Sequence, residues 1–301
     1  MRILRNHHPN ASVVLHRGDC LPFLRSLPAR SVMLVLTSPP YNVGKTYESR
    51  SDMGTYLASQ RLVITELARI VHPEGSVCWQ VGNHVWHGQV YPIDSLVYRD
   101  FIDSGFRLRN RVIWHFEHGL HCTTRFSGRY ETVCWFTKSD EYKFYLDRIR
   151  VPQKYPGKKH YKGPKKGQFS SNPKGQNPGD VWAIPNVKHN HPEKTQHPCQ
   201  FPLELAERLI LALTDPGDLV CDPYMGSGTT VAAAILHKRR AAGADILGSF
   251  VEIAEKRVRQ AANGKLPRRA FGRPIYAPPA NTPLTTPPWD KNGKRGPQSE
   301  Q

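Results

Sequence analysis

A strand, a glycine turn and a helix follow one another in residues 218–230, and this order constrains the fold more than any other feature. The segment reads Asp-Leu-Val-Cys-Asp-Pro-Tyr-Met-Gly-Ser-Gly-Thr-Thr. Its apolar residues predict a buried strand that ends at Asp222, and Gly226 and Gly228 allow a sharp turn that a ligand can approach closely. Open α/β sheets bind their ligands at such carboxyl ends of strands.

Asp245 strengthens this interpretation. It ends a second apolar strand, 241–245, which follows the helix predicted at 229–237. An acid in this place can accept hydrogen bonds from ribose hydroxyls. Because the turn lacks the GK[ST] element of a P-loop and the third glycine of the dinucleotide fingerprint, we predict a nucleoside cofactor site of another kind. A side chain added at Gly228 is expected to meet the bound nucleoside.

Strands and helices alternate along most of the chain. Short apolar runs predict strands, and apolar residues at helical spacing predict helices. The further strands are expected at 31–36, 77–81, 106–116 and 131–137, and the further helices at 56–71, 92–104, 202–213 and 250–262. This alternation predicts an α/β fold with a doubly wound sheet.

A second motif, Thr-Ser-Pro-Pro-Tyr-Asn at 37–42, directly follows the strand expected at 31–36. An exocyclic amine of a base is a poor nucleophile, because its lone pair is delocalised into the ring. Ser38 Oγ and the Pro39 carbonyl could each accept a hydrogen bond from one of its two N–H groups and so free that lone pair. Pro39 and Pro40 fix the backbone, and Tyr41 offers a face on which an extruded base can stack. We therefore predict a catalytic site at Ser38, Pro39, Pro40 and Tyr41.

The charge of the chain favours a polyanionic partner. Its 42 Lys and Arg exceed its 25 Asp and Glu, which gives a net charge of +17, and basic side chains on phosphates release condensed counterions. Residues 148–179 contain nine Lys or Arg, no acid and no clear period, so we expect a loop-rich region. The lysines predicted to bind DNA there are Lys154, Lys158, Lys159, Lys162, Lys165 and Lys166.

Together the two motifs resemble those of the amino-directed DNA methyltransferases, which use S-adenosyl-L-methionine to modify cytosine N4 or adenine N6. The catalytic motif precedes the glycine turn here, which resembles the β subgroup, whose target-recognition region lies between the two. The resemblance covers most of residues 12–262. It implies a Rossmann-like, mostly parallel sheet of seven strands, one of them antiparallel, with an inserted, loop-rich, basic recognition region.

The resemblance also implies roles for single residues. Asp19 would contact the adenine ring of the cofactor, Asp245 the ribose, and the stretch 194–202 would close over the methionine part. The full set of expected cofactor-binding residues is Asp19, Thr37, Pro198, Phe201, Asp222, Pro223, Tyr224, Gly226, Gly228, Thr229, Thr230 and Asp245.

Four segments are expected along the chain. Residues 12–116 form the catalytic half of the methyltransferase domain, 117–195 the target-recognition region with some core strands, and 196–262 the cofactor-binding half. Residues 263–301 are basic and rich in proline, so we expect a disordered tail. No apolar run approaches the roughly 18 residues that span a bilayer, and the first residues do not form a secretory signal. We therefore expect a cytoplasmic protein without membrane contact.

Two other chemistries are disfavoured. Pro198-Cys199-Gln200 is similar to the nucleophile motif of cytosine-C5 methyltransferases, but in that family the cofactor turn precedes the cysteine, whereas here it follows. A zinc site would need a second close pair of ligands, and none accompanies His115, His118, His121 and Cys122. We predict neither a covalent cysteine nor a bound metal.

The expected reaction is methylation of cytosine N4 in double-stranded DNA, since Ser-Pro-Pro-Tyr is usual for that target in the family. Adenine N6, whose enzymes usually carry Asp-Pro-Pro-Tyr or Asn-Pro-Pro-Tyr, is the alternative. An RNA methyltransferase or a catalytically inactive DNA-binding protein is a more distant possibility. The partners could include a second copy of the chain, as a homodimer, and a cognate restriction endonuclease acting on the same site.

Overall fold

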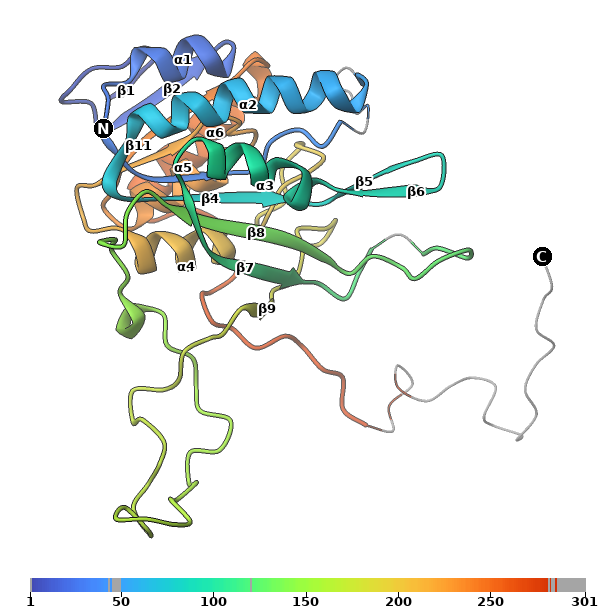
Figure 1. Cartoon of the computed structure of the whole chain (residues 1–301), viewed down its shortest axis with the longest axis vertical. Coiled ribbons are helices and arrows are strands. Elements are labelled where there is room, and N and C mark those ends of the chain that lie inside the picture. Colours follow the sequence, from blue (N-terminus) through green and yellow to red (C-terminus); the bar gives the residue numbers. More distant parts are fainter. Residues whose placement is uncertain are drawn as a thin grey trace.

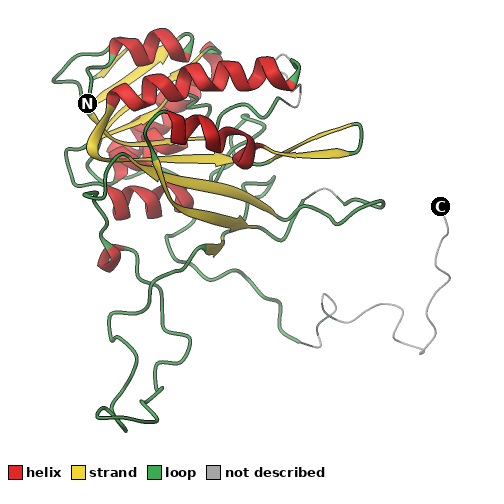
Figure 2. Cartoon of the chain, in the orientation of Figure 1, coloured by secondary structure: helices red, strands yellow, loops and turns green. Residues whose placement is uncertain are grey.

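A large mixed sheet with helices on both faces forms the body of the protein in the computed structural model (Figure 1, Figure 2). Residues 2–42, 44, 50–119, 121–280, 282 and 285 are described. The strands are β1 (Ile3–Leu4), β2 (Val13–Arg17), β3 (Val32–Thr37), β4 (Val71–Val81), β5 (Asn83–Trp86), β6 (Gln89–Pro92), β7 (Arg107–His115), β8 (Tyr130–Thr137), β9 (Val181–Ala183), β10 (Leu219–Asp222) and β11 (Arg240–Asp245). The helices are α1 (Cys20–Ser26), α2 (Met53–Ile70), α3 (Ile93–Asp103), α4 (Leu203–Leu213), α5 (Thr229–Leu236), α6 (Gly248–Ala262) and the short 3₁₀ helix η1 (Leu146–Arg148).

The described residues place nine strands in the large sheet, in the order β1-β2-β11-β10-β3-β4-β8-β7-β9. Strand β8 is antiparallel to both of its neighbours, and the other neighbouring strands run parallel. The predicted doubly wound, mostly parallel sheet is confirmed. Its expected seven strands are joined by two short edge strands, β1 and β9, and a separate hairpin is formed by β5 and β6.

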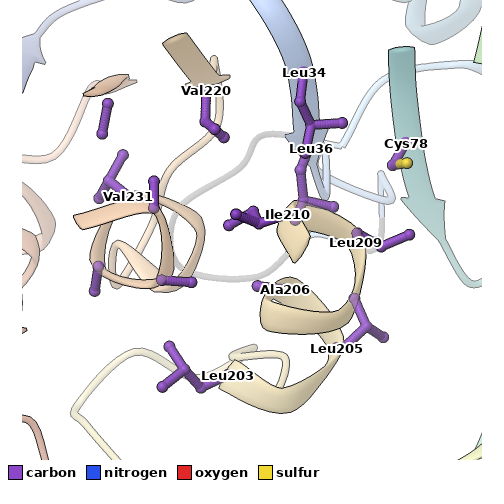
Figure 3. Packing of buried hydrophobic residues seen from close by; sticks show 14 of the residues in the cluster. Leu34, Leu36, Cys78, Leu203, Leu205, Ala206, Leu209, Ile210, Val220 and Val231 are labelled. Atoms are coloured by element: carbon purple, nitrogen blue, oxygen red, sulfur yellow. The ribbon is translucent and has the colours of Figure 1, made fainter. Parts of the chain in front are cut away.

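Two apolar cores lie on the two faces of the sheet. One contains buried side chains of α4, α5 and α6, and the other contains those of α1, α2 and α3. Strand β3 serves both, since Leu34 and Leu36 belong to the first core and Val35 to the second. Figure 3 shows Leu34 and Leu36 facing Leu209 and Ile210 of α4. Burial of such a side chain contributes about 1.5–3 kcal/mol, which fixes β3 firmly in the middle of the sheet.

The winding of the sheet reverses between β3 and β10. From β3 the chain proceeds to its neighbour β4, and from β10 it proceeds to β11 on the other side. The loops that leave the carboxyl ends of β3 and β10 therefore diverge, and open α/β sheets generally bind their ligands at such a point. These two loops carry the two sequence motifs.

The basic segment, residues 148–179, projects from the amino ends of the strands, opposite to the two loops that carry the motifs. It follows η1 and leads into β9, which runs parallel to β7, so it returns to the amino end of the sheet. Its base is held there by Arg148, which donates to the Thr214 carbonyl at 2.9 Å, and by Lys143, whose Nζ lies 2.8 Å from Asp218 Oδ2. Figure 1 shows the segment extending away from the body.

The start of the C-terminal segment departs from the expectation of a disordered tail. Leu266 is only 8% exposed and belongs to the core that contains α4. Arg268 and Arg269 form ion pairs of 2.7 and 2.6 Å with Glu207 and Glu204 of α4. The composition is poor in apolar residues, but one leucine and two paired arginines dock these first residues on the domain.

Among the described residues, no helix combines the length and apolar character needed to cross a membrane.

Candidate active site

Thr37 and Asp222 join the two motifs. They end the neighbouring parallel strands β3 and β10, and Thr37 Oγ1 donates a 2.6 Å hydrogen bond to Asp222 Oδ1. Thr37 is fully buried and Asp222 is 1% exposed. The loop that carries the predicted catalytic motif, residues 38–42 and called the catalytic loop below, and the glycine turn therefore leave the sheet from one shared point.

The Asp222 carboxyl has an unusual environment. Burial raises its pKa to about 6, although the hydrogen bond from Thr37 opposes that shift. Its Oδ2 is buried without a hydrogen-bond partner in the described part of the chain. Because a buried acceptor without a partner is costly, this oxygen fits a site whose ligand supplies a donor.

The glycine turn is built on left-handed backbone. Gly226 and Gly228 have φ of +48° and +75°, and the Gly226 amide donates to Asp245 Oδ2 at 3.0 Å. A Cβ at Gly228 would lie 2.6 Å from Ala254 Cβ of α6. A side chain there would collide with α6, because Gly228 begins α5 where the two helices pack closely, and the expected contact with the nucleoside stays a prediction.

The segment 193–202 covers this turn. A Cβ at Gly226 would lie 2.8 Å from His197 Nε2, so His197 stands directly against the turn, and Pro198 follows it. The Thr229 hydroxyl donates to the Phe201 carbonyl at 3.4 Å. The structure therefore brings the segment expected to close over the cofactor to the predicted turn.

Arg257 of α6 supports the glycine turn through hydrogen bonds and was not predicted. Its Nη1 donates to the Ser227 carbonyl and to Thr229 Oγ1, both at 2.9 Å. Burial lowers the pKa of this guanidinium to about 10. An arginine on an amphipathic helix usually extends into solvent, so the sequence carried no signal for this role.

The remaining expected cofactor residues follow the carboxyl ends of β2 and β10 or lie in the first turn of α5. Strand β2 pairs with β11, with Arg17 opposite Asp245, and Asp19 follows as the N-cap of α1. Pro223 is buried in the turn. Tyr224 packs edge-on against Trp79 at 6.4 Å, and burial raises the pKa of its hydroxyl. Thr230 is buried and donates to the Leu36 carbonyl at 3.1 Å.

Four polar side chains form a network at the catalytic loop. Tyr41 Oη donates to Glu131 Oε2 at 3.2 Å, and Gln80 Nε2 donates to Tyr41 Oη at 2.8 Å. Gln80 also donates to Glu131 Oε2. Ser38 Oγ lies 3.0 Å from Tyr41 Oη. Burial, followed by the charge of Glu131, raises the pKa of Tyr41, so its hydroxyl keeps its proton.

The network fixes the direction of the Ser38 hydrogen bond. Tyr41 has one proton, which it gives to Glu131, so the short contact between the two hydroxyls requires Ser38 to donate to Tyr41. The lone pairs of Ser38 Oγ then remain available to accept an N–H bond. This arrangement suits the acceptor role expected of Ser38.

Further contacts within the described part of the chain hold the catalytic loop. The Tyr56 hydroxyl donates to the Pro40 carbonyl at 2.9 Å, and Asn42 Nδ2 donates to the Ser51 carbonyl at 2.7 Å. His84 Nδ1 lies 3.1 Å from the Tyr41 carbonyl. Helix α2 and the β5–β6 hairpin therefore both help to position the loop.

The structure brings the predicted catalytic and cofactor residues together, but not the predicted DNA-binding lysines. Those lysines are exposed on the segment anchored at the amino ends of the strands. Gln80 and Glu131 were not predicted, although each is a polar residue beside a run of buried residues, at the end of its strand nearest Tyr41. Polar residues in such positions were the signal that could have found them.

Comparisons with known proteins agree with this arrangement. The profile of the N6/N4 family, described as DNA methylase, matches residues 32–256. The chain is 47% identical over 257 residues to the type II methyltransferase M.BglII of Bacillus subtilis, which covers 83% of this chain and 71% of that protein.

Two solved structures have a similar fold. The PvuII DNA methyltransferase, described as cytosine-N4-specific, aligns with a TM-score of 0.67 and 22% identity over 84% of this chain and 92% of that chain. A DNA modification methylase of Thermus thermophilus, solved in complex with S-adenosyl-L-methionine, aligns with a TM-score of 0.60 and 26% identity over 83% of this chain and 96% of that chain. The matched residues 32–256 include the catalytic loop and the glycine turn, and the chain belongs to the N6/N4 DNA methylase family.

Proposed function

We propose that this S-adenosyl-L-methionine-dependent DNA methyltransferase transfers the methyl group to the exocyclic N4 amine of a cytosine flipped out of the duplex. The observation that carries the proposal is the Ser38–Tyr41–Glu131 chain of hydrogen bonds. It leaves Ser38 Oγ as a neutral acceptor at the point where the target amine would enter.

The chemistry requires a freed lone pair on the amine nitrogen. Ser38 Oγ accepts one N–H bond and the Pro39 carbonyl accepts the other, so the nitrogen moves toward tetrahedral geometry. The half-buried Tyr41 ring stacks with the base. The nitrogen becomes acidic when its new bond to carbon forms and then releases one proton, so no strong base is needed in the free enzyme.

The serine is the reason to favour cytosine N4 over adenine N6. A carboxylate or amide in the first position of the motif offers an acceptor oxygen without help, whereas a hydroxyl can also donate. Tyr41 Oη accepts the hydrogen bond from Ser38, and Glu131 accepts the one from Tyr41, which leaves the Ser38 oxygen free to act as an acceptor toward the amine. A built support for serine favours the target that Ser-Pro-Pro-Tyr enzymes usually modify.

The cofactor supplies an activated methyl group on its sulfonium. Asp222, with its unpaired Oδ2, and the turn at Gly226 and Gly228 would hold it beneath the 193–202 segment. Asp245 and Asp19, at the ends of β11 and β2, would contact the ribose and the adenine. The enzyme then accelerates the reaction by positioning, because it holds the methyl donor and the amine nitrogen in the geometry that the transfer requires.

The partner is DNA, and the exposed lysines of the basic segment would contact its phosphates outside the flipped base. Lys154 and Lys159 each lie over an aromatic ring, at 5.5 Å from Tyr155 and 5.2 Å from Phe169, which preorganises basic and aromatic groups together. A homodimer and a cognate restriction endonuclease stay predictions.

Sequencing of DNA from cells that express the chain, by a method that detects modified bases, tests the proposal. We expect N4-methylcytosine at one short sequence, absent from cells that express Ser38→Ala. N6-methyladenine at one sequence would instead support the adenine alternative. Methylated RNA with unmodified DNA, or no modification despite DNA binding, would support the two remaining alternatives.

A further inference from the structure

Two segments flank the catalytic loop at the carboxyl end of the sheet. One is the β5–β6 hairpin, whose His84 contacts the Tyr41 carbonyl. The other is the β7–β8 loop, residues 116–129, which ends just before Tyr130 and Glu131. Since Glu131 accepts from Tyr41 Oη, this loop is tied directly to the catalytic network.

The β7–β8 loop has internal supports. The Phe116 amide donates to the Arg129 carbonyl at 2.9 Å and closes the base of the loop. Nearer its tip, the Cys122 amide donates to Ser127 Oγ at 3.0 Å. Asn186 Nδ2 donates to the His118 carbonyl at 2.9 Å and connects the loop to the chain that follows β9. The turn at 122–127 is therefore presented outward in a defined way.

Phe126 stands on that turn and is 100% exposed. By contrast, Trp86 on the neighbouring hairpin is 39% exposed, and Arg50 and His87 cover its ring at 4.1 and 4.4 Å. Single exposed apolar residues are common on proteins. A fully exposed phenyl ring on a braced loop beside a catalytic site is a more specific feature, because its ring is available to an incoming partner.

The charge around Phe126 suits DNA. The loop contains Arg125 and Arg129 and a single acid, Glu117, and Arg125 is exposed directly beside Phe126. Basic side chains can hold phosphates while an apolar side chain enters the base stack, as in proteins that kink DNA with apolar wedges.

The reach of the loop is sufficient. Phe126 precedes Glu131 by five positions, and a chain extends at most about 3.6 Å per residue, so their Cα atoms lie within about 18 Å of each other. Phe126 therefore stays close to the catalytic network, where the DNA around a bound base would lie.

We propose that Phe126 enters the DNA at the place that the target base leaves, and stabilises the flipped state by stacking on the neighbouring bases. This inference rests on the proposed function. An extruded base leaves a gap whose neighbours have lost stacking, which costs a few kcal/mol. A phenyl ring in that gap restores part of the contact, and it affects the rate less when the target base is mismatched, because flipping then no longer limits the reaction.

The test compares matched and mismatched DNA. The probes are duplexes that contain the modified sequence found by sequencing, with the target base either paired correctly or opposite a mismatch. Single-turnover methylation by Phe126→Ala should fall about tenfold or more on the matched duplex and stay near the wild-type rate on the mismatched one, because a mismatch lowers the cost of flipping. Phe126→Leu should retain most of the matched rate.

Phe169→Ala is the matched control, since Phe169 is also an exposed phenylalanine, at 65%, but lies on the basic segment at the other end of the sheet. Its ratio of matched to mismatched rates should equal that of the wild type. Equal slowing of Phe126→Ala on both duplexes, or no slowing on either, would overturn the proposal. A wild-type chain that methylates neither duplex would overturn the proposed function instead.

Discussion

Thr37 Oγ1 donates a 2.6 Å hydrogen bond to Asp222 Oδ1, between residues 185 positions apart in the chain. The bond joins the last residue of β3 to the last residue of β10, where the winding of the sheet reverses. Ser38 follows the first residue and the glycine turn follows the second. The distance between Ser38, the proposed amine acceptor, and the glycine turn is therefore set by the body of the sheet.

Replacing Thr37 with Val should weaken both loops. The valine fills the same space but removes the donor, and loss of a buried hydrogen bond of this kind costs about 1–3 kcal/mol. We expect that loss in the free energy of unfolding by urea, together with weaker cofactor binding by calorimetry. Thr37→Ser keeps the hydroxyl and serves as the control. An unchanged cofactor affinity in Thr37→Val would show that the bond does not support the site.

Cofactor binding should depend on pH through Asp222. Burial raises the pKa of this carboxyl to about 6, so it is ionised at pH 7.5 and increasingly protonated below 6. If the cofactor binds the ionised form, affinity falls by up to about tenfold per pH unit below 6. Asp222→Asn should bind weakly, with a flat profile in calorimetry between pH 5 and 7.5. A parallel decline in wild type and Asp222→Asn would assign the pH dependence to another group.

The same shift has the opposite effect on stability. Because the folded pKa lies above the ordinary value of 3.8, the contribution of this group to folding is complete below about pH 4 and is lost as the pH rises through 6. Asp222→Asn should therefore gain stability relative to the wild type as the pH rises from 4 to 7. The comparison needs no cofactor, so it tests the pKa separately from binding.

Ser38 and Glu131 should act on turnover rather than on binding. Ser38→Ala removes an acceptor whose bond strengthens as the nitrogen becomes tetrahedral, and such losses lower kcat by about 100-fold or more. Glu131→Gln should lower kcat less, because a glutamine can still accept from Tyr41 but can also donate and reverse the network. Ser31→Ala, in the turn just before β3 begins, is the control. A rise in KM for DNA with unchanged kcat in Ser38→Ala would contradict the acceptor role.

The basic segment should account for part of the salt dependence of DNA binding. Changing Lys158, Lys159, Lys165 and Lys166 to Ala removes up to four phosphate contacts, and each contributes about 0.9 to the slope of log affinity against log salt. The slope should flatten by up to about 3.6, with cofactor affinity unchanged. An unaltered slope would mean that the segment does not contact phosphate while DNA is bound.

Much of the fold could be predicted because the strands are conspicuous in the sequence. The runs at 31–36 and 219–222 are short and apolar, and they became β3 (Val32–Thr37) and β10 (Leu219–Asp222). The β5–β6 hairpin was missed, since Asn83–Trp86 and Gln89–Pro92 are mostly exposed and lack an apolar face. The docking of the first tail residues was missed for a similar reason, because they dock through one leucine and ion pairs rather than through an apolar pattern.

The candidate site divides in the same way. Ser38, Tyr41, Asp222 and the two glycines lie within compact motifs, whose chemistry can be inferred from neighbouring residues in the chain. Gln80 and Glu131 reach Tyr41 from β4 and β8, and Arg257 reaches the turn from α6. Contacts of this kind depend on strand pairing and helix packing, which a single sequence does not specify.

The most direct test of the account is the identity of the methylated base. Purified protein is incubated with methyl-labelled S-adenosyl-L-methionine and duplex DNA, the DNA is digested to nucleosides, and the labelled product is identified by mass. Ser38, with its hydrogen bond to Tyr41, predicts N4-methyldeoxycytidine as the labelled nucleoside. The Ser38→Ala variant should not produce this nucleoside. Label found in N6-methyldeoxyadenosine, or no label in DNA at all, would contradict the proposed reaction.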